Sequence, residues 1–271
     1  MSMIIGIVLV ILFFAITYGG KHLSFWGAIL FAAVIAFFAY FGLWNLLILL
    51  LGAYGVLMVI EKATREKRKA ITVSILQKTG KRTGIQVFAN GFAALLSIVL
   101  YIATEERMFI IVYAVGIGET FTDCIASDIG VLSKCAPRDI CTFRRIEPGL
   151  SGGISLLGII ASFIAGILFG LLTYLCIRIS FYETLIIATF AMLGSIIDSL
   201  LGSLIQAKYQ CSVCNVHTEK IRHCEALTKH IGGFRKIDNC AVNFLSNSVV
   251  CVLCALYLRW GGEYVRLFTG A

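Results

Sequence analysis

The chain has 271 residues, of which 59% are hydrophobic and only 14% charged, and its mean hydropathy is +0.92. Because soluble globular domains carry about 25% charged residues, this composition excludes a soluble domain and predicts an all-α, polytopic bundle of transmembrane helices. The net charge of +8 is explained by topology signals and attraction to anionic headgroups, so we expect a lipid bilayer as partner and no nucleic acid.

About eight apolar segments are long enough, or nearly long enough, to cross a hydrocarbon core about 30 Å thick. The first segment lacks the basic start and the small-residue cleavage site of a signal peptide, so we count it as a span. With only two prolines and no Ser/Gly-rich linker, residues 1–271 are expected to form a single membrane domain. The expected spans are 3–19, 24–41, 43–60, 85–103, 108–130, 150–176, 181–205 and 240–260.

The distribution of basic residues predicts the orientation of the chain. With eight spans, the connections at 20–23, 61–84, 131–149 and 206–239 share one face of the membrane and hold 19 of the 23 Lys and Arg residues. Short loops rich in Lys and Arg remain in the cytoplasm, so both termini are predicted to lie outside. The longest loop, 206–239, is then cytoplasmic.

Three carboxylates interrupt the apolar segment 108–130. Glu119, Asp123 and Ser127 are four residues apart and share one helix face, whereas Asp128 is displaced around the helix. A carboxylate that faces lipid costs about 2.5–3.5 kcal/mol, so this stripe should face the protein interior or water. For Asp128, a solvated position at the end of the helix is the alternative.

Two further stripes of polar residues have the same four-residue spacing. Each could line a ligand site, or could form hydrogen bonds between helices. The first stripe leads from a basic entrance into an amide lining and consists of Lys78, Arg82, Gln86 and Asn90. The second stripe consists of Asp238 and Asn239, followed by Asn243 and Asn247.

The seventh expected span carries one buried acid. Asp198 has Gly194 and Gly202 one turn away on either side and Gln206 farther along. Small neighbours allow another backbone to approach, so an interior position for Asp198 fits better than a lipid-facing one. In the predicted orientation, all these polar stripes lie toward the cytoplasmic ends of their spans and can converge.

Converging carboxylates, amides and cations suit a divalent metal ion together with a polyphosphate. Mg²⁺ takes one or two carboxylates plus substrate phosphates, while Lys and Arg neutralise a transferring phosphoryl group. No histidine lies inside an expected span and no nucleophilic serine elbow occurs. The sequence therefore does not indicate hydrolysis by a covalent route.

A glycine-rich stretch connects the fifth and sixth spans in the sequence PRDICTFRRIEPGLSGGIS. Pro148 and Gly149 are expected to end the loop, and Ser151, Gly152 and Gly153 to open the next helix. Backbone N–H groups at a helix N-terminus can bind phosphate. A plain helix start is the alternative.

The polar residues resemble, in their order, the membrane family that contains phytyl-phosphate kinase and transmembrane protein 19, known as domain-of-unknown-function family 92. The resemblance runs from about Lys21 to about Asn247. The chain departs from the family pattern at Cys124, Asp128, Leu150 and Cys240. The resemblance is carried by Arg82, Gln86, Val87, Ala89, Asn90, Gly91, Asp123, Ala126, Ser127, Ile129, Gly130, Pro137, Arg138, Ile140, Thr142, Pro148, Gly149, Gly152, Gly153, Asp198, Ser199, Gly202, Gln206, Asp238, Asn239, Val242 and Asn243.

The resemblance implies a multipass enzyme that uses CTP to phosphorylate an isoprenoid monophosphate. Asp123, Asp198 and Asp238 would hold Mg²⁺, and Arg82 would complete the catalytic set. A cytidylyltransferase that makes a CDP-activated lipid and an ion-coupled secondary transporter are the alternatives. The residues expected to bind nucleotide or lipid phosphate are Lys78, Gln86, Asn90, Glu119, Ser127, Asp128, Gly152, Gly153, Ser199, Gln206, Asn239 and Asn243.

The loop 206–239 contains the stretch CSVCNVHTEKIRHC. Cys211, Cys214, His217 and Cys224 are residue types that bind zinc, and zinc would fold a loop too small to bury its own core. Free thiols are the alternative. A disulfide is disfavoured on a reducing cytoplasmic face.

Overall fold

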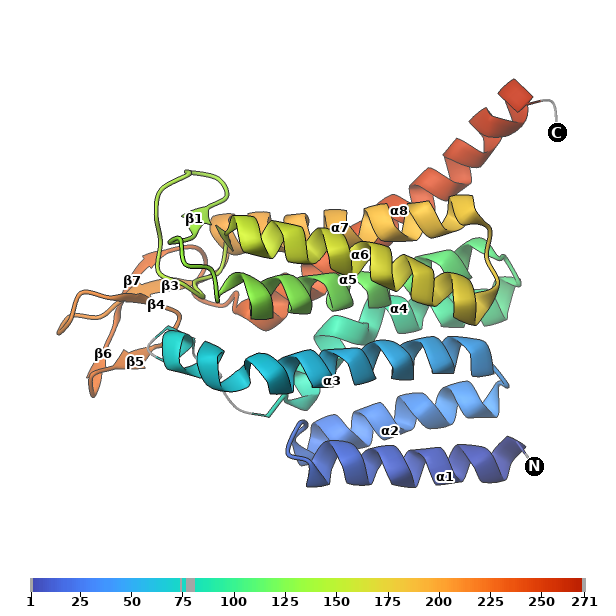
Figure 1. Cartoon of the computed structure of the whole chain (residues 1–271), viewed down its shortest axis with the longest axis horizontal. Coiled ribbons are helices and arrows are strands. Elements are labelled where there is room, and N and C mark those ends of the chain that lie inside the picture. Colours follow the sequence, from blue (N-terminus) through green and yellow to red (C-terminus); the bar gives the residue numbers. More distant parts are fainter. Residues whose placement is uncertain (1, 74, 77–80, 270–271) are drawn as a thin grey trace.

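Eight helices lie side by side in one bundle in the computed structural model, which describes residues 2–73, 75–76 and 81–269 (Figure 1). The fold class predicted from the sequence is confirmed. The helices are α1 (Ser2–Phe14), continued by the π-helix η1 (Ala15–Gly19), α2 (Phe25–Tyr40), α3 (Trp44–Thr72), α4 (Gly84–Thr104), α5 (Met108–Gly130), α6 (Leu156–Ile177), α7 (Phe181–Leu204) and α8 (Asn239–Thr269).

Six helices in the described part of the chain, α3 to α8, are long and apolar enough to cross a membrane. The chain is therefore a multipass integral membrane protein. At 1.5 Å per residue, α1 with η1 is only about 27 Å long and α2 about 24 Å. These shorter apolar helices lie at one side of the bundle, with α2 beside α3 and α1 beside α2. Helix α3 continues to Thr72, through charged residues that the sequence analysis assigned to a loop.

Both ends of the described chain lie at one end of the bundle, and the basic connections gather at the other (Figure 1). This arrangement agrees with the predicted alternation of the loops. Which end faces the cytoplasm stays a prediction. We refer to the end with the basic connections as the basic end.

Short strands order the long connections at the basic end (Figure 1). Between α5 and α6, β1 pairs with β2 in antiparallel fashion. Between α7 and α8, three strands form a sheet of order β4-β3-β7, and β5 pairs with β6 in a hairpin. The strands are β1 (Arg138–Asp139), β2 (Gly153–Ile154), β3 (Lys208–Gln210), β4 (His217–Thr218), β5 (Arg222–His223), β6 (Ala226–Leu227) and β7 (Lys229–Gly232).

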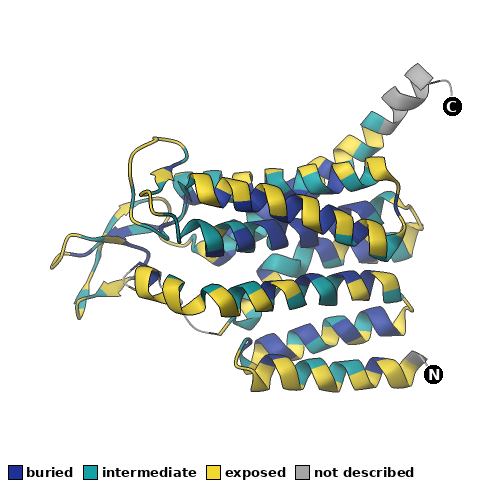
Figure 2. Ribbon diagram, viewed as in Figure 1, coloured by how far each residue is buried: buried dark blue, intermediate teal, exposed yellow. Residues whose placement is uncertain are grey.

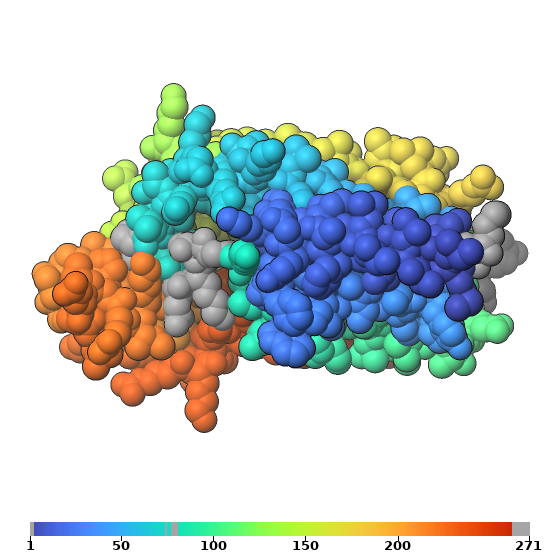
Figure 3. Space-filling model, turned by 90° about the horizontal axis from the view of Figure 1, so that it is seen from below, coloured from blue at the N-terminus to red at the C-terminus, as the bar shows by residue number. Residues whose placement is uncertain are grey.

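Helix α5 is the centre of the bundle. Its most apolar stretch is mostly buried, whereas the other five membrane-length helices bury less than half of theirs (Figure 2). Glycines permit the close packing, since a Cβ on Gly118 would lie 2.8 Å from the ring of Phe169 on α6. The Tyr113 hydroxyl donates to the carbonyl oxygen of Leu46 on α3 at 2.9 Å. Viewed from below, α1 and α2 cover one side of the bundle, and residues 206–239 lie at one end (Figure 3).

Candidate functional site

A polar cavity of about 810 Å³ opens at the basic end, between helices α3 to α8 and the connecting loops. It brings together nearly all the predicted phosphate-site residues. Lys78 lies outside the described residues, and Glu119 does not line the cavity. The predicted residues that line it are Arg82, Gln86, Asn90, Asp123, Ser127, Asp128, Gly152, Gly153, Asp198, Ser199, Gln206, Asp238, Asn239 and Asn243.

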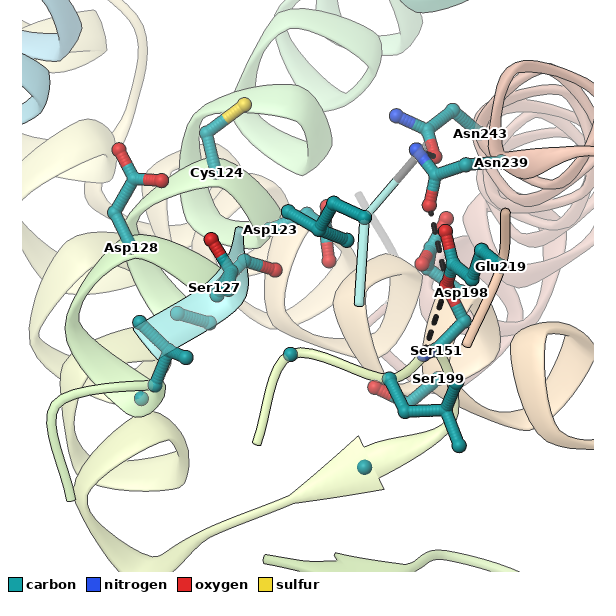
Figure 4. Close-up of a pocket in the computed structure, with 18 of the residues that line it drawn as sticks. Asp123, Cys124, Ser127, Asp128, Ser151, Asp198, Ser199, Glu219, Asn239 and Asn243 are labelled. Carbon is teal, nitrogen blue, oxygen red and sulfur yellow. Dashed lines mark hydrogen bonds between the residues drawn. The ribbon is translucent and has the colours of Figure 1, made fainter. Parts of the chain in front are cut away.

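Two half-buried carboxylates face each other across this cavity (Figure 4). Asp123 projects from α5 and accepts a hydrogen bond from the Ser195 hydroxyl at 3.3 Å. Asp198 projects from α7, one turn after Ser195, and its Oδ2 lies 3.1 Å from the hydroxyl of Ser246 on α8. Three helices thus hold the pair of acids in place.

Glu119 lies behind the cavity wall and is only 2% exposed. Ser246 donates to its Oε1 at 2.9 Å, and the amide of Asn247 donates to its Oε2 at 2.6 Å. A hydroxyl has one proton, so Ser246 can donate to Glu119 or to Asp198 but not to both at once. Glu119 does not form part of the cavity wall. Through its hydrogen bond with Ser246, it instead positions the Ser246 hydroxyl beside Asp198.

Amide side chains form a second wall of the cavity, where α4 meets α8. The amide of Asn243 lies 3.1 Å from those of Asn90 and Asn239, and it comes within 3.3 Å of Asp198 Oδ2. The Ser151 hydroxyl donates to Asn239 Oδ1 at 3.4 Å. The amide stripes predicted on α4 and α8 therefore form hydrogen bonds between helices, and they also line the cavity. Ligand binding by these amides stays a prediction.

Basic residues surround the mouth of the cavity. Arg82, at the start of α4, lies 3.8 Å from Glu61 on α3. On the extension of α3 that the sequence analysis missed, Arg68 forms an ion pair with Asp128. Asp128 is only 5% exposed, so the alternative of a solvated helix end is wrong for this residue.

Two predicted ligands also have structural roles at helix starts. Gln86 Oε1 accepts from the Thr83 backbone N–H at 2.8 Å and completes a capping box at α4. Asp238 Oδ1 accepts from the backbone N–H groups of Cys240 and Ala241 at 3.0 and 3.1 Å, which caps α8. These bonds orient both side chains at the cavity wall.

The glycine-rich stretch does not open a helix, contrary to the prediction. Helix α6 begins at Leu156, because the Ser155 side chain caps it by accepting from the Gly158 N–H at 3.1 Å. Gly152 has φ of +84°, and a Cβ there would lie 2.6 Å from Ser203 Cα. Gly152 therefore lets the backbone cross closely over the end of α7, next to Gly202.

Two acids outside the membrane-length helices were not identified from the sequence. Glu219 is 7% exposed, lines the cavity and accepts from the Ser151 N–H at 3.1 Å, and burial raises the pKa of its carboxyl group. Burial alone would also raise the pKa of Asp139, but hydrogen bonds from Ser203 and Thr142 outweigh it and lower that pKa. Glu219 joins two loops distant in sequence, and Asp139 joins its loop to Ser203 at the end of α7, so no local pattern predicts these long-range contacts.

The two facing acids of the cavity form no ion pair. Among the described residues, no Lys or Arg is paired with Asp123 or Asp198, whereas Glu61 pairs with Arg82 and Asp128 with Arg68. Neighbouring carboxylates in a partly buried site require a compensating cation. The donor set of carboxylate oxygens with nearby amide oxygens fits Mg²⁺.

A smaller apolar pocket of about 150 Å³ adjoins the polar cavity between α2, α3, α4 and α5. The two share Arg82, Gln86 and Asn90 as lining residues. The inner surface of the apolar pocket is formed by residues such as Phe31, Leu57, Phe92 and Phe121.

The cysteine-rich loop brings together three of its four predicted ligands. Cys211, Cys214 and Cys224 cluster with His223, not with His217. His217 begins β4, where it pairs with Gln210, and this pairing takes its side chain out of the cluster. The pKa of the Cys211 thiol is lowered to about 6, chiefly by hydrogen bonding from the backbone N–H of Cys214.

The fold and the cavity define a polytopic helical membrane protein with an acidic and amide-lined site at one end. The chain belongs to the integral membrane protein family DUF92, whose family model matches residues 8–251. It is 30% identical over 226 residues to Protein PGR of Arabidopsis thaliana. The aligned region covers 71% of this chain and 77% of the plant protein. It is 31% identical over 172 residues to an uncharacterized membrane protein of Methanocaldococcus jannaschii, covering 62% of this chain and 68% of the archaeal one. No solved structure matches the chain.

Proposed function

We propose that this protein is a Mg²⁺-dependent lipid-phosphate kinase that transfers the γ-phosphoryl group of CTP to an isoprenoid monophosphate. The products are the isoprenoid diphosphate and CDP. The observation that supports this most directly is the facing pair Asp123 and Asp198, neither of which forms an ion pair with a Lys or Arg in the described part of the chain. Mg²⁺ bound to substrate phosphates takes one or two carboxylates of this kind.

The proposed reaction needs no dedicated base. An oxygen of the lipid phosphate, already charged near neutral pH, forms a bond to the γ-phosphorus as the bond to the β–γ bridging oxygen breaks. Mg²⁺ would supply charge neutralisation, held by Asp123 and Asp198 with Asp238 beside them. Arg82 would contact the transferring group, and the amides of Asn90, Asn239 and Asn243 would orient the phosphates.

The apolar pocket supports an amphiphilic substrate. Arg82, Gln86 and Asn90 line it together with the polar cavity. A lipid phosphate could place its charged head among these residues and the first part of its chain against Phe92 and Phe121. A soluble phosphate compound would leave this apolar surface unused, so the pocket favours a lipid.

The test is transfer from labelled nucleotide by purified protein. CTP or ATP carrying a γ-phosphate label is incubated with Mg²⁺ and a panel of prenyl monophosphates, and labelled prenyl diphosphate is measured. Asp123→Asn should fold normally and lose at least about 10²-fold in turnover, as when one preorganised electrostatic group is removed. The matched control is Glu106→Gln, which removes an acid near Arg259 at the opposite end of the bundle and should leave turnover unchanged.

Three results would contradict the proposal, each in a different way. Near-normal turnover of Asp123→Asn would show that Asp123 is not needed for catalysis. Release of pyrophosphate with a CDP-lipid product would show a cytidylyltransferase. Uptake of a solute into proteoliposomes without consumption of nucleotide would show a transporter.

A further inference from the structure

Four potential metal ligands converge in the loop between α7 and α8. The sulfur atoms of Cys211, Cys214 and Cys224 and a ring nitrogen of His223 all lie within 4.8 Å of one another. The Sγ atoms of Cys214 and Cys224 are 3.8 Å apart. His223 Nδ1 is 3.5 Å from Cys214 Sγ and 3.2 Å from Cys224 Sγ.

These distances match the edges of a tetrahedron around one ion. With Zn–S of about 2.3 Å and Zn–N of about 2.0–2.1 Å, tetrahedral angles place two sulfurs about 3.8 Å apart and a sulfur and a nitrogen about 3.6 Å apart. A disulfide would need an S–S distance of about 2.05 Å. The Cys214–Cys224 separation therefore excludes a disulfide between these residues as arranged and fits a shared metal ion.

The backbone at these ligands adopts conformations that need support. Cys224 and Glu225 form the two-residue turn of the β5–β6 hairpin, and both have positive φ, 49° and 61°. Such turns favour Asn-Gly or Gly-Gly, not Cys-Glu. Asn215, which follows Cys214, is also at positive φ. Strained residues persist where other interactions fix them, and a metal ion held by Cys214 and Cys224 would do so.

The residues between the two pairs of ligands reach the polar cavity. The Thr218 hydroxyl and the Glu219 backbone N–H both donate to the carbonyl oxygen of Ile75, at 2.8 and 2.9 Å, just after α3. The Glu219 carboxylate accepts from Ser151 and lines the cavity. This segment can hold that position only while its own shape is fixed at both ends.

We propose that Cys211, Cys214, His223 and Cys224 bind a structural Zn²⁺ ion, which holds the intervening segment against the end of α3 and thereby fixes the wall of the cavity that contains Glu219. The strands have only two to four residues, and apolar side chains such as Val213, Leu227 and Phe234 are exposed, so the loop buries too little surface to be ordered by packing alone. Three thiolates and one imidazole in tetrahedral arrangement favour zinc over Mg²⁺ or Ca²⁺. The proposal is independent of the kinase activity.

The first test is metal analysis of the purified full-length protein. Wild-type protein should contain about one zinc per chain, and Cys214→Ser and Cys224→Ser should each lose most of it. Cys135→Ser is the matched control, because Cys135 is an exposed cysteine outside the group, and it should keep its zinc. Metal-free wild-type protein, zinc retained in both cluster variants, or iron with visible absorption in place of zinc would each overturn the site.

The second test asks whether the metal fixes the segment. Trypsin cleavage after Lys220 and Arg222, between the ligands, should become at least about tenfold faster when zinc is removed with a chelator, and should slow again when zinc is returned. Cleavage after Arg144 and Arg145, in the exposed loop between α5 and α6, should not change. Equal cleavage between the ligands with and without zinc would refute the role in holding the cavity wall, even if zinc is bound.

Discussion

Gly194→Ala should destabilise the protein strongly, because this glycine leaves room for the buried carboxylate of Glu119. A Cβ at position 194 would overlap Glu119 Cγ and would lie 3.1 Å from Glu119 Cβ and 3.2 Å from Val250 Cγ1. Overpacking of a close-packed site costs about 1–3 kcal/mol. If Glu119 moves away, it also weakens its hydrogen bonds from Ser246 and Asn247, each worth about 0.5–1.5 kcal/mol.

The two effects together predict a loss of about 2–6 kcal/mol, which corresponds to a decrease in Tm of more than about 4 °C. The assay is thermal denaturation of purified protein in detergent. The quantity measured at each temperature is the fraction of protein that stays monodisperse. Gly55→Ala in α3 is the control, because no atom lies within 4 Å of a Cβ there. A helical Gly→Ala change without a clash gains about 0.5–1 kcal/mol, so this variant should equal or exceed the wild type.

A double variant separates the clash from other effects of the new methyl group. When Glu119→Ala has already removed Cγ, the added change Gly194→Ala should cost at least about 1 kcal/mol less than it does in the wild type. Equal stability of the Gly194→Ala and Gly55→Ala variants would refute the packing of Glu119 against α7. So would an equal loss of stability from Gly194→Ala in the wild type and in the Glu119→Ala variant.

Three further predictions concern the basic end and the orientation of the chain. Arg68→Gln should lower stability by about 1–3 kcal/mol, because it leaves the buried Asp128 unpaired; adding Asp128→Asn should restore part of the loss, and no restoration would contradict the pairing. The lowered pKa of Asp139 contributes stability above the unfolded-state pKa, about 3.9, and this is lost as pH falls through the lower folded value. Acid denaturation curves of wild type and Asp139→Asn should therefore converge at low pH, and curves that stay parallel would exclude the effect. A C-terminal tag should react with an impermeant label on intact cells, and labelling only after permeabilisation would reverse the predicted orientation.

The membrane-length helices were predictable because lipid exposure requires long apolar segments. The same criterion failed for the end of α3, where Glu61 to Thr72 form a charged helix outside the apolar region. Its sequence has no glycine or proline, and Glu61 and Arg65 are one turn apart, so helical continuation was readable from propensity and charge spacing. Hydropathy alone does not detect a helix that extends into water, and Arg68 was missed for that reason.

The lining of the cavity was predictable where the lining residues follow a helical period, as Asn90 and Asn243 do. It was not predictable where loops meet. Ser151 and Glu219 are 68 residues apart and join through one hydrogen bond, which no local pattern encodes. The glycines beside Asp198 were only partly predictable. As expected, Gly202 allows another backbone, that of Gly152, to approach closely. Gly194 instead makes room for the side chain of Glu119.

The distribution of charge in the cavity constrains what it can bind. Its acids are buried or half-buried, as for Asp123, Asp198 and Glu219, whereas most of its basic residues, such as Lys81 and Arg235, are exposed; Arg68 and Arg82 are half-buried. A bare cation would be repelled at the opening, and a bare phosphate would be repelled by the acids within. A polyphosphate that carries a divalent cation meets both regions favourably, with the phosphates near the basic residues and the cation between the carboxylates. For the function proposed above, this complementarity favours a metal–nucleotide complex over either ion alone, and we expect the affinity for nucleotide to depend on Mg²⁺.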